Sequence, residues 1–148
     1  MVATLRRQAP VVDRLRSIDQ FSGCKKGQLR EVGRLAEQVR VGKGEILVKE
    51  GHFGRDLFLI LSGTVEVTQQ GRLVNVLGPS DFFGELAVFN RGPRNATVTA
   101  LSELELLIIG RREFDAMLQI PEFRSALLKM MASRLQTVDA QLATALNG

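Results

Sequence analysis

The fold of this 148-residue chain is decided between Asp56 and Leu77, where the sequence reads DLFLILSGTVEVTQQGRLVNVL. Three short runs in this stretch are rich in Val, Ile, Leu and Thr, residues that favour β-strands. Ser62–Gly63 and Gln70–Gly71 separate the runs, and such glycine-containing dipeptides are typical of tight hairpin turns. The stretch therefore predicts three strands joined by two hairpins, at Asp56–Leu61, Thr64–Gln69 and Leu73–Leu77.

The same pattern extends on both sides of this stretch. Further short apolar runs occupy Glu45–Val48, Ala96–Ala100 and Leu104–Ile109, and glycines recur between the runs. Parallel strands need long crossover connections, and no helix-length segment lies between these runs, so a parallel α/β fold is disfavoured. Many short strands at this spacing predict a mainly β fold, as a sandwich, a jelly roll or a small barrel, over about residues 40–109.

Helical patterns flank the predicted barrel. Before it, Leu29 and Val32 begin an apolar pattern at helical spacing that extends to about Val39. Residues 1–20 are expected to form a separate N-terminal arm, in which Val11–Ile18 is either a short helix or ordered without one. After the barrel we expect a helical pair within about 111–145, with Pro121 at the start of the second helix. That helix has an apolar stripe made of Phe123, Leu127, Met130, Met131, Leu135, Val138 and Leu142.

Charge and composition limit the classes of partner. The net charge of +4 and the pI near 9.8 are compatible with nucleic-acid binding. However, residues 1–20 hold four arginines against two aspartates, which is half of the net excess, and elsewhere basic and acidic residues alternate. This distribution argues against nucleic acid as the partner.

The location follows from what the sequence lacks. No stretch approaches the ~20 consecutive apolar residues that cross a bilayer, and Met1–Arg7 has no apolar run of a signal peptide. Cys24 is the single cysteine, so no internal disulfide can form. We therefore expect a cytoplasmic protein that makes no contact with a membrane.

The segment FFGELAVFNRGPRNATV, from Phe82 to Val98, has the properties of a phosphate cradle. Gly84 allows a sharp turn and a close approach of the backbone. The run Glu85–Phe89 is long enough for one helical turn, whose first N–H groups would attract an anion. Arg94 then supplies a fixed charge and a planar set of donors suited to phosphate oxygens.

Glu85 narrows the kind of ligand. A carboxylate repels phosphate but accepts hydrogen bonds from the hydroxyl groups of a ribose, so Arg94 and Glu85 together predict a nucleotide. One arginine balances a singly charged phosphodiester better than a triphosphate. The chain also has no GxxxxGK[ST] motif, which disfavours ATP or GTP with magnesium.

At this point the sequence resembles the cyclic nucleotide-binding domain family. FGELA at Phe83–Ala87, followed by PRNATV at Pro93–Val98, is similar to the phosphate-binding cassette of that family. The resemblance covers about Phe21–Leu142 and includes early strand segments at Gly44–Leu47 and Phe58–Val67. It implies a jelly-roll β-barrel with N-terminal helices and a C-terminal helical pair, and it makes 21–148 the binding domain.

The resemblance also assigns roles to residues. Arg94 would pair with the exocyclic phosphate oxygens and Glu85 with the ribose 2′-hydroxyl. Backbone amides of Leu86–Ala87 and Asn95–Ala96 would complete the phosphate shell, with Gly84 shaping the turn. Asn95 stands where the family usually has Ala, Ser or Thr, which favours cAMP as ligand and leaves cGMP as the alternative. Candidates for the family's cap over the base are Leu127, Met131, Arg134 and Leu135.

Catalysis is not expected. His52 is the only histidine and is predicted to be an exposed loop residue, so a multi-histidine metal site is excluded, and no cofactor other than the nucleotide ligand is expected. Cys24 has no histidine near it in sequence, and no GxSxG motif is present. The remaining alternative is a degenerate binding fold that acts as a protein-interaction module without ligand.

The output of such a sensor is left open by the sequence. Neither a helix-turn-helix nor a kinase motif follows the last helix, so we expect either an unidentified effector protein or a fused output domain. The apolar stripe from Phe123 to Leu142 could pack on the barrel or form a homodimer.

Overall fold

The computed structural model describes residues 2–4, 11–18, 21–84, 92–129 and 131–132 of the chain. The strands are β1 (Val2–Thr4), β2 (Glu37–Val41), β3 (Ile46–Val48), β4 (Leu57–Ser62), β5 (Val65–Gln69), β6 (Arg72–Leu77), β7 (Phe82–Phe83), β8 (Thr97–Ala100) and β9 (Leu104–Ile109). The helices are α1 (Val11–Arg16), α2 (Lys26–Leu35) and α4 (Arg111–Met117), and residues 121–129 and 131–132 are also helical.

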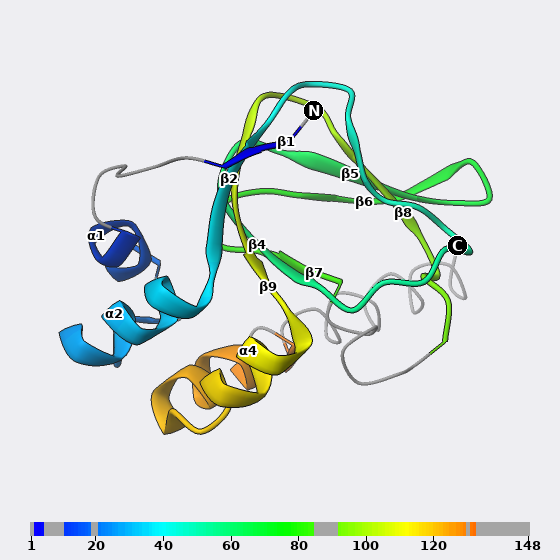
Figure 1. The fold of residues 1–148 in the computed structure, drawn as a ribbon. Coiled ribbons are helices and arrows are strands. Elements are labelled where there is room, and N and C mark those ends of the chain that lie inside the picture. The colour runs from blue at the N-terminus through cyan, green and yellow to red at the C-terminus, as the bar shows by residue number, and fades with distance from the viewer. Residues whose placement is uncertain (1, 5–10, 19–20, 85–91, 130, 133–148) are drawn as a thin grey trace, which may run out of the picture.

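The strands form two antiparallel sheets that enclose an apolar interior (Figure 1). One sheet has five strands in the order β1-β2-β9-β4-β7, and the other has four in the order β3-β8-β5-β6. The helices α1, α2 and α4 gather on one side, next to the five-stranded sheet (Figure 1). The predicted mainly β jelly roll with flanking helices is thus confirmed.

Strand β4 of the five-stranded sheet is buried on both faces. Along β4, Leu57 and Leu59 belong to the cluster packed with the helices, whereas Phe58 and Ile60 belong to the interior between the sheets. Successive side chains of a strand point to opposite faces, so both faces of β4 are covered. This explains why β4 reads as a continuous apolar run and not as an alternating one.

We call the cluster on the helix side of this sheet the helix-side cluster. Its largest members are Phe21, Phe82, Phe114 and Phe123, each at most 1% exposed. A further contact ties the N-terminal region to the sheet, because the guanidinium of Arg14 in α1 pairs with the carboxylate of Glu105 in β9. Part of the positive charge of the arm is therefore balanced within the chain.

The prediction of a hairpin at Gln70–Gly71 is confirmed. Gln69 of β5 lies opposite Arg72 of β6, and Gln70 and Gly71 both have left-handed backbones, with φ of +51° and +78°. Two consecutive left-handed residues are the property of the type I′ turn, whose twist matches that of the flanking strands.

The prediction of a hairpin at Ser62–Gly63 is wrong. β4 pairs with β7 and β9, whereas β5 pairs with β6 and β8, so the chain crosses from one sheet to the other at Gly63. The strands that pair with β4, which are β7 and β9, and those that pair with β5, which are β6 and β8, all come later in the sequence. Local turn chemistry could not show this, because it does not say which strand becomes the neighbour.

The first helical region is shorter than predicted. α2 ends at Leu35, and β2 starts at Glu37 although the helical pattern was expected to reach about Val39. Val39 and Val41 are both buried at a spacing of two residues, so packing against the barrel interior decides for a strand. β1 was not predicted within the arm, and it pairs with β2 at the edge of the sheet.

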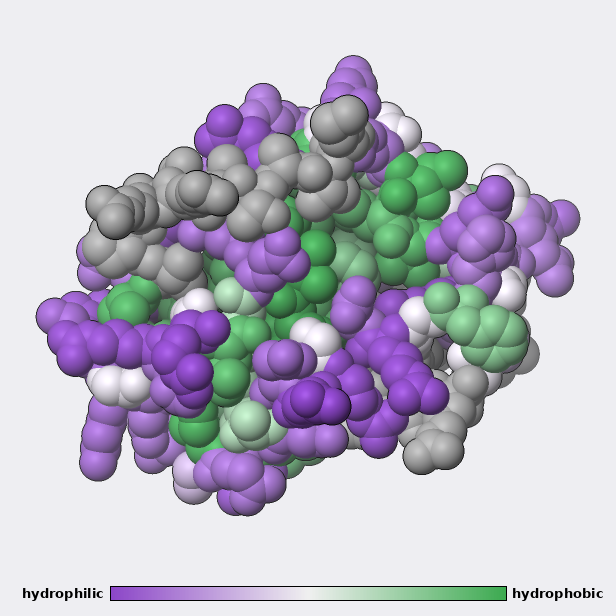
Figure 2. Space-filling model, in the orientation of Figure 1, coloured by the Kyte–Doolittle hydropathy of each residue, from purple (hydrophilic) through white to green (hydrophobic). Residues whose placement is uncertain are grey.

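Hydrophilic residues cover most of the face seen in Figure 1, and apolar residues emerge along its middle (Figure 2). The exposed large apolar side chains of the described residues are Ile46, Phe53, Leu73, Val74, Val76, Leu101 and Leu128. Ile46 and Phe53 lie at the pocket that contains Arg94.

Candidate functional site

The main chain of Arg94 is fixed by the loop between β3 and β4. The N–H of Gly51 donates to the carbonyl of Arg94 at 2.8 Å, and the N–H of Arg94 donates to the carbonyl of His52 at 2.8 Å. These two bonds form a short antiparallel ladder outside the regular strands. The arginine thereby gains a defined backbone position although it lies in a connecting segment.

The side chain of Arg94 is held by two further carbonyl groups. Its Nη1 donates to the carbonyl of Gly84 at 3.1 Å, and its Nη2 donates to the carbonyl of Asp56 at 3.1 Å. These acceptors lie directly after β7 and directly before β4. Because a guanidinium is planar and always charged, two bonds at different nitrogens fix both its place and its plane.

A pocket of about 400 Å³ contains this guanidinium. β3 supplies one wall, and Lys49, His52, Phe53, Gly54 and Asp56 come from the following loop. The volume lies within the range of roughly 300–1,000 Å³ that is usual for small-molecule sites. The described lining carries two positively charged side chains, Lys49 and Arg94, and one carboxylate, Asp56, so its net charge favours an anionic ligand.

Gly84 adopts the sharp turn that the sequence predicts. Its φ is +85°, and a Cβ on it would lie 2.7 Å from the Asp56 carbonyl oxygen and 2.9 Å from Arg94 Nη1. A side chain is therefore opposed by both the left-handed backbone and the lack of space. The structure thus brings Gly84 and Arg94 together across ten residues of sequence.

The segment after Arg94 is connected to the β5–β6 hairpin. Gln69 Nε2 donates to the carbonyl of Asn95 at 3.1 Å, and Thr97 Oγ1 accepts the N–H of Glu50 at 3.0 Å. A peptide group is planar and trans, so the N–H of Ala96 points away from Gln69. The side chain of Asn95 is exposed, and Ala96 is half-buried.

The two residues of β7 face different cores. The Phe83 ring stacks on the Phe58 ring at 4.7 Å between centroids, within the interior of the barrel. Phe82 packs in the helix-side cluster, where its ring centroid is 6.5 Å from that of Phe123 and 6.3 Å from that of Phe21. The strand that leads into Gly84 is therefore in contact with both the interior and the C-terminal helical region.

The remaining predicted site residues and the cap candidates do not all lie at the pocket that contains Arg94. Glu85, Leu86 and Ala87 lie outside the described residues, as do the cap candidates Arg134 and Leu135. Leu127 is 2% exposed in the helix-side cluster, and Met131 is partly buried against it. In this conformation Leu127 does not cap the barrel interior, because it packs on the helix side of the five-stranded sheet.

Sequence reasoning missed the loop that holds Arg94. Gly51, His52, Gly54 and Asp56 all contribute, through backbone groups or through the absence of a side chain. His52 is exposed, as predicted, but its carbonyl binds the Arg94 N–H. The closely spaced Gly51 and Gly54 between two strands were the available signal, although backbone contacts leave no residue-type signature of their own.

Two observations on the described residues concern metal binding and the reactivity of Cys24. No group of three or more His, Cys, Asp or Glu side chains there could hold a metal ion. Burial, aided by the nearby charge of Glu122, raises the pKa of the Cys24 thiol, which lowers its nucleophilic fraction. Within the described part of the chain, no helix combines the length and the apolar character of a membrane span.

Comparison with known proteins defines the class. The family model for the cyclic nucleotide-binding domain matches residues 38–120, which is more than half of the chain. This chain therefore belongs to the cyclic nucleotide-binding domain family, as the resemblance of its cassette implied.

Individual relatives give a closer description. The chain is 30% identical to a CRP-like cAMP-activated global transcriptional regulator of Mycobacterium tuberculosis over 129 residues, covering 83% of this chain and 58% of that protein. It is 30% identical to the cyclic AMP receptor protein of Thermus thermophilus over 106 residues, covering 68% and 49%. The crystal structure of the Thermus thermophilus catabolite activator protein is similar with a TM-score of 0.74, at 26% identity, covering 85% of this chain and 62% of that one. The chain thus spans about half the length of the curated relatives that it matches.

Proposed function

We propose that this domain binds cAMP as a regulatory ligand and carries out no chemistry on it. The observation that carries the proposal is the Arg94 guanidinium, held by two backbone carbonyls within a pocket of about 400 Å³. A cyclic phosphate bears one negative charge, which a single fixed arginine can balance in a partly desolvated site. The relatives named as cAMP-activated or as cyclic AMP receptors support the same ligand.

In the proposed complex, Arg94 pairs with the exocyclic phosphate oxygens. Glu85 accepts the ribose 2′-hydroxyl, and backbone amides of Leu86–Ala87 and Asn95–Ala96 complete the phosphate shell beside Gly84. The orientation of the Ala96 N–H away from Gln69 is compatible with this role. Asn95 favours cAMP over cGMP, because the hydroxyl side chain often associated with guanine is missing.

Binding is proposed to move the C-terminal helical region. A ligand can drive such a change only if it binds one arrangement better than the other. The support is β7, since Phe83 contacts the barrel interior and Phe82 contacts Phe123 of the helical region. A displacement of the cassette after Gly84 would therefore be felt in the helix-side cluster.

The domain must pass its ligand-bound state on to another part of the protein or to a partner. We propose that it acts on a fused output domain or an effector protein in the cytoplasm, and that the C-terminal stripe offers a dimer contact. The Mycobacterium tuberculosis relative is named a transcriptional regulator, so the expectation against nucleic acid as a partner finds no support.

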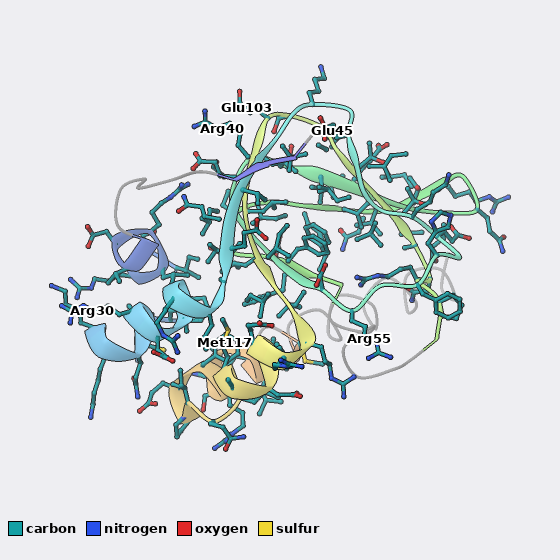
Figure 3. The ribbon with its side chains drawn as sticks, viewed as in Figure 1. Arg30, Arg40, Glu45, Arg55, Glu103 and Met117 are labelled. Carbon is teal, nitrogen blue, oxygen red and sulfur yellow. The ribbon has the colours of Figure 1, made fainter. Side chains whose placement is uncertain are left out.

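The function is tested by titration calorimetry with cAMP on the wild type, Arg94→Ala and Arg30→Ala. We expect Arg94→Ala to weaken binding by about 100-fold or more, because it removes the charged partner of the phosphate. Arg30→Ala removes an equal charge from α2, which lies apart from Arg55 of the loop between β3 and β4 (Figure 3), and should bind like the wild type. Unchanged affinity in Arg94→Ala would overturn the assignment of the site.

A thermal-shift panel of cAMP, cGMP, AMP and ATP tests the choice of ligand. Stabilisation by cAMP at lower concentrations than by the others is expected. If no cyclic nucleotide stabilises the wild type, the chain is a degenerate fold that acts through protein contacts, and the proposed function fails.

A further inference from the structure

The guanidinium of Arg94 lies directly against the backbone of Gly54. A Cβ on Gly54 would be 2.8 Å from Nη2, 2.9 Å from Nε and 3.2 Å from Cζ of Arg94. Real Cβ atoms essentially never come within 3.0 Å of a heavy atom, as the contacts with Nη2 and Nε would require. The space that a side chain of residue 54 would fill is therefore already taken by the charged group.

Backbone conformation gives no separate reason for a glycine at this position. Gly54 is not among the described glycines with left-handed φ, which are Gly44, Gly51, Gly63, Gly71 and Gly84. Its φ therefore lies outside the left-handed region that favours glycine. The requirement at Gly54 is thus one of space for the guanidinium alone, whereas Gly84 also needs its left-handed backbone.

An alanine at this position would displace the guanidinium and leave the loop in place. The loop backbone is fixed by the bonds between Arg94 and residues Gly51 and His52, and these bonds do not involve the side chain. The atoms that a Cβ would meet belong to the far end of a flexible side chain, which can rotate away at modest cost. Rotation would move Nη1 and Nη2 away from the carbonyls of Gly84 and Asp56.

We propose that Gly54 is a positioning residue for Arg94: its missing side chain leaves the space that keeps the guanidinium at the two carbonyls. Through its effect on Arg94, Gly54 sets the affinity for the phosphate-bearing ligand. The affinity consequence rests on the proposed function, whereas the contact between Gly54 and Arg94 does not.

The first measurement is the affinity of Gly54→Ala for cAMP by calorimetry. We expect binding to weaken by about tenfold or more, since a displaced guanidinium loses charge-assisted hydrogen bonds. The matched control is Gly42→Ala, where a Cβ would meet only Glu45 Oε1 at an ordinary 3.6 Å and no left-handed φ is required. It should bind as the wild type does. Wild-type affinity in Gly54→Ala would overturn the proposal.

The second measurement needs no ligand. Melting temperatures of the wild type, Gly54→Ala, Arg94→Ala and the double variant form a double-mutant cycle. We expect Gly54→Ala to lower Tm by roughly 2–4 °C when Arg94 is present and to have no effect in the Arg94→Ala background. An equal loss in both backgrounds would overturn the proposal.

The two measurements separate this inference from the proposed function. If the wild type binds no cyclic nucleotide, the proposed function fails, and the cycle still decides whether Gly54 positions Arg94. If the wild type binds cAMP but the cycle shows no coupling, the function stands and the inference about Gly54 fails.

Discussion

The crossing at Gly63 and the hairpin at Gly71 are similar in sequence and different in structure. Both glycines follow a polar residue at the end of a β-run, and both have left-handed φ, at +92° and +78°. At Gly71 the chain reverses into β6, and a Cβ would meet nothing within 4 Å. At Gly63 the chain crosses between the sheets, and a Cβ would lie 2.3 Å from the Glu103 carbonyl oxygen.

The difference shows that a turn can require glycine for its backbone conformation alone, as at Gly71, or for both its conformation and the lack of space for a side chain, as at Gly63. The Gly63 crossing is covered by the β8–β9 turn, where Ser102 Oγ accepts the N–H of Thr64 at 3.1 Å. The Gly71 hairpin is exposed. Its base is nevertheless connected to the segment after Arg94, through the hydrogen bond from Gln69 to the Asn95 carbonyl. One turn is therefore a structural junction, and the other adjoins the proposed site.

The largest difference between the two turns is expected in the free energy of unfolding when each glycine is replaced by alanine. Gly63→Ala should lower the free energy of unfolding by about 3 kcal/mol or more, because a backbone clash adds to the left-handed strain. Gly71→Ala should lower it by about 1 kcal/mol, since only the backbone strain applies. Urea unfolding of both variants measures the contrast, and equal losses would show that the crossing is not tightly packed.

A smaller effect is expected on ligand binding. Gln69→Ala removes the bond to the Asn95 carbonyl and should weaken cAMP binding roughly two- to threefold, at the low end for an exposed hydrogen bond. Gln119→Ala, an exposed glutamine after α4, should leave the affinity unchanged. Calorimetry tests the pair, and identical affinities for both variants would separate the hairpin from the site.

The smallest effect is a gain in stability. Gln70 has a φ of +51°, and asparagine tolerates this conformation better and is preferred before glycine in a type I′ turn. Gln70→Asn should therefore raise the free energy of unfolding by about 0.5 kcal/mol. Gln69→Asn, in a strand without left-handed φ, should give no gain in the same unfolding experiment. A gain from both variants would contradict the turn-specific explanation.

The sequence predicted the strands well because their signal is local. The bounds of β9 agree with the prediction, and β3, β4, β5, β6 and β8 agree within one residue at each end. β2 was taken for helix, because its short run follows a helical pattern without a clear stop signal. The two-residue strand β7 was missed, because pairing with Phe58 and Leu59 defines it and no pattern of its own does.

The candidate site was predictable only in part. Arg94 and Gly84 were identified from residue types whose chemistry suits a phosphate, and the structure places them 3.1 Å apart through Nη1 and the glycine carbonyl. Asp56 and His52 were not identified as supports of Arg94, because they contribute backbone carbonyl oxygens, which every residue has.

By itself the sequence determined the mainly β class, the flanking helices and the family, since these depend on periodicity, turn residues and a cassette of fixed spacing. Only the tertiary structure decided that Gly63 joins two sheets, that Leu127 packs on the helix side, and that Gly54 makes room for Arg94. These three features arise from contacts between residues distant in sequence. Their geometry is fixed when the sheets and helices pack together, and no local pattern of residues contains it.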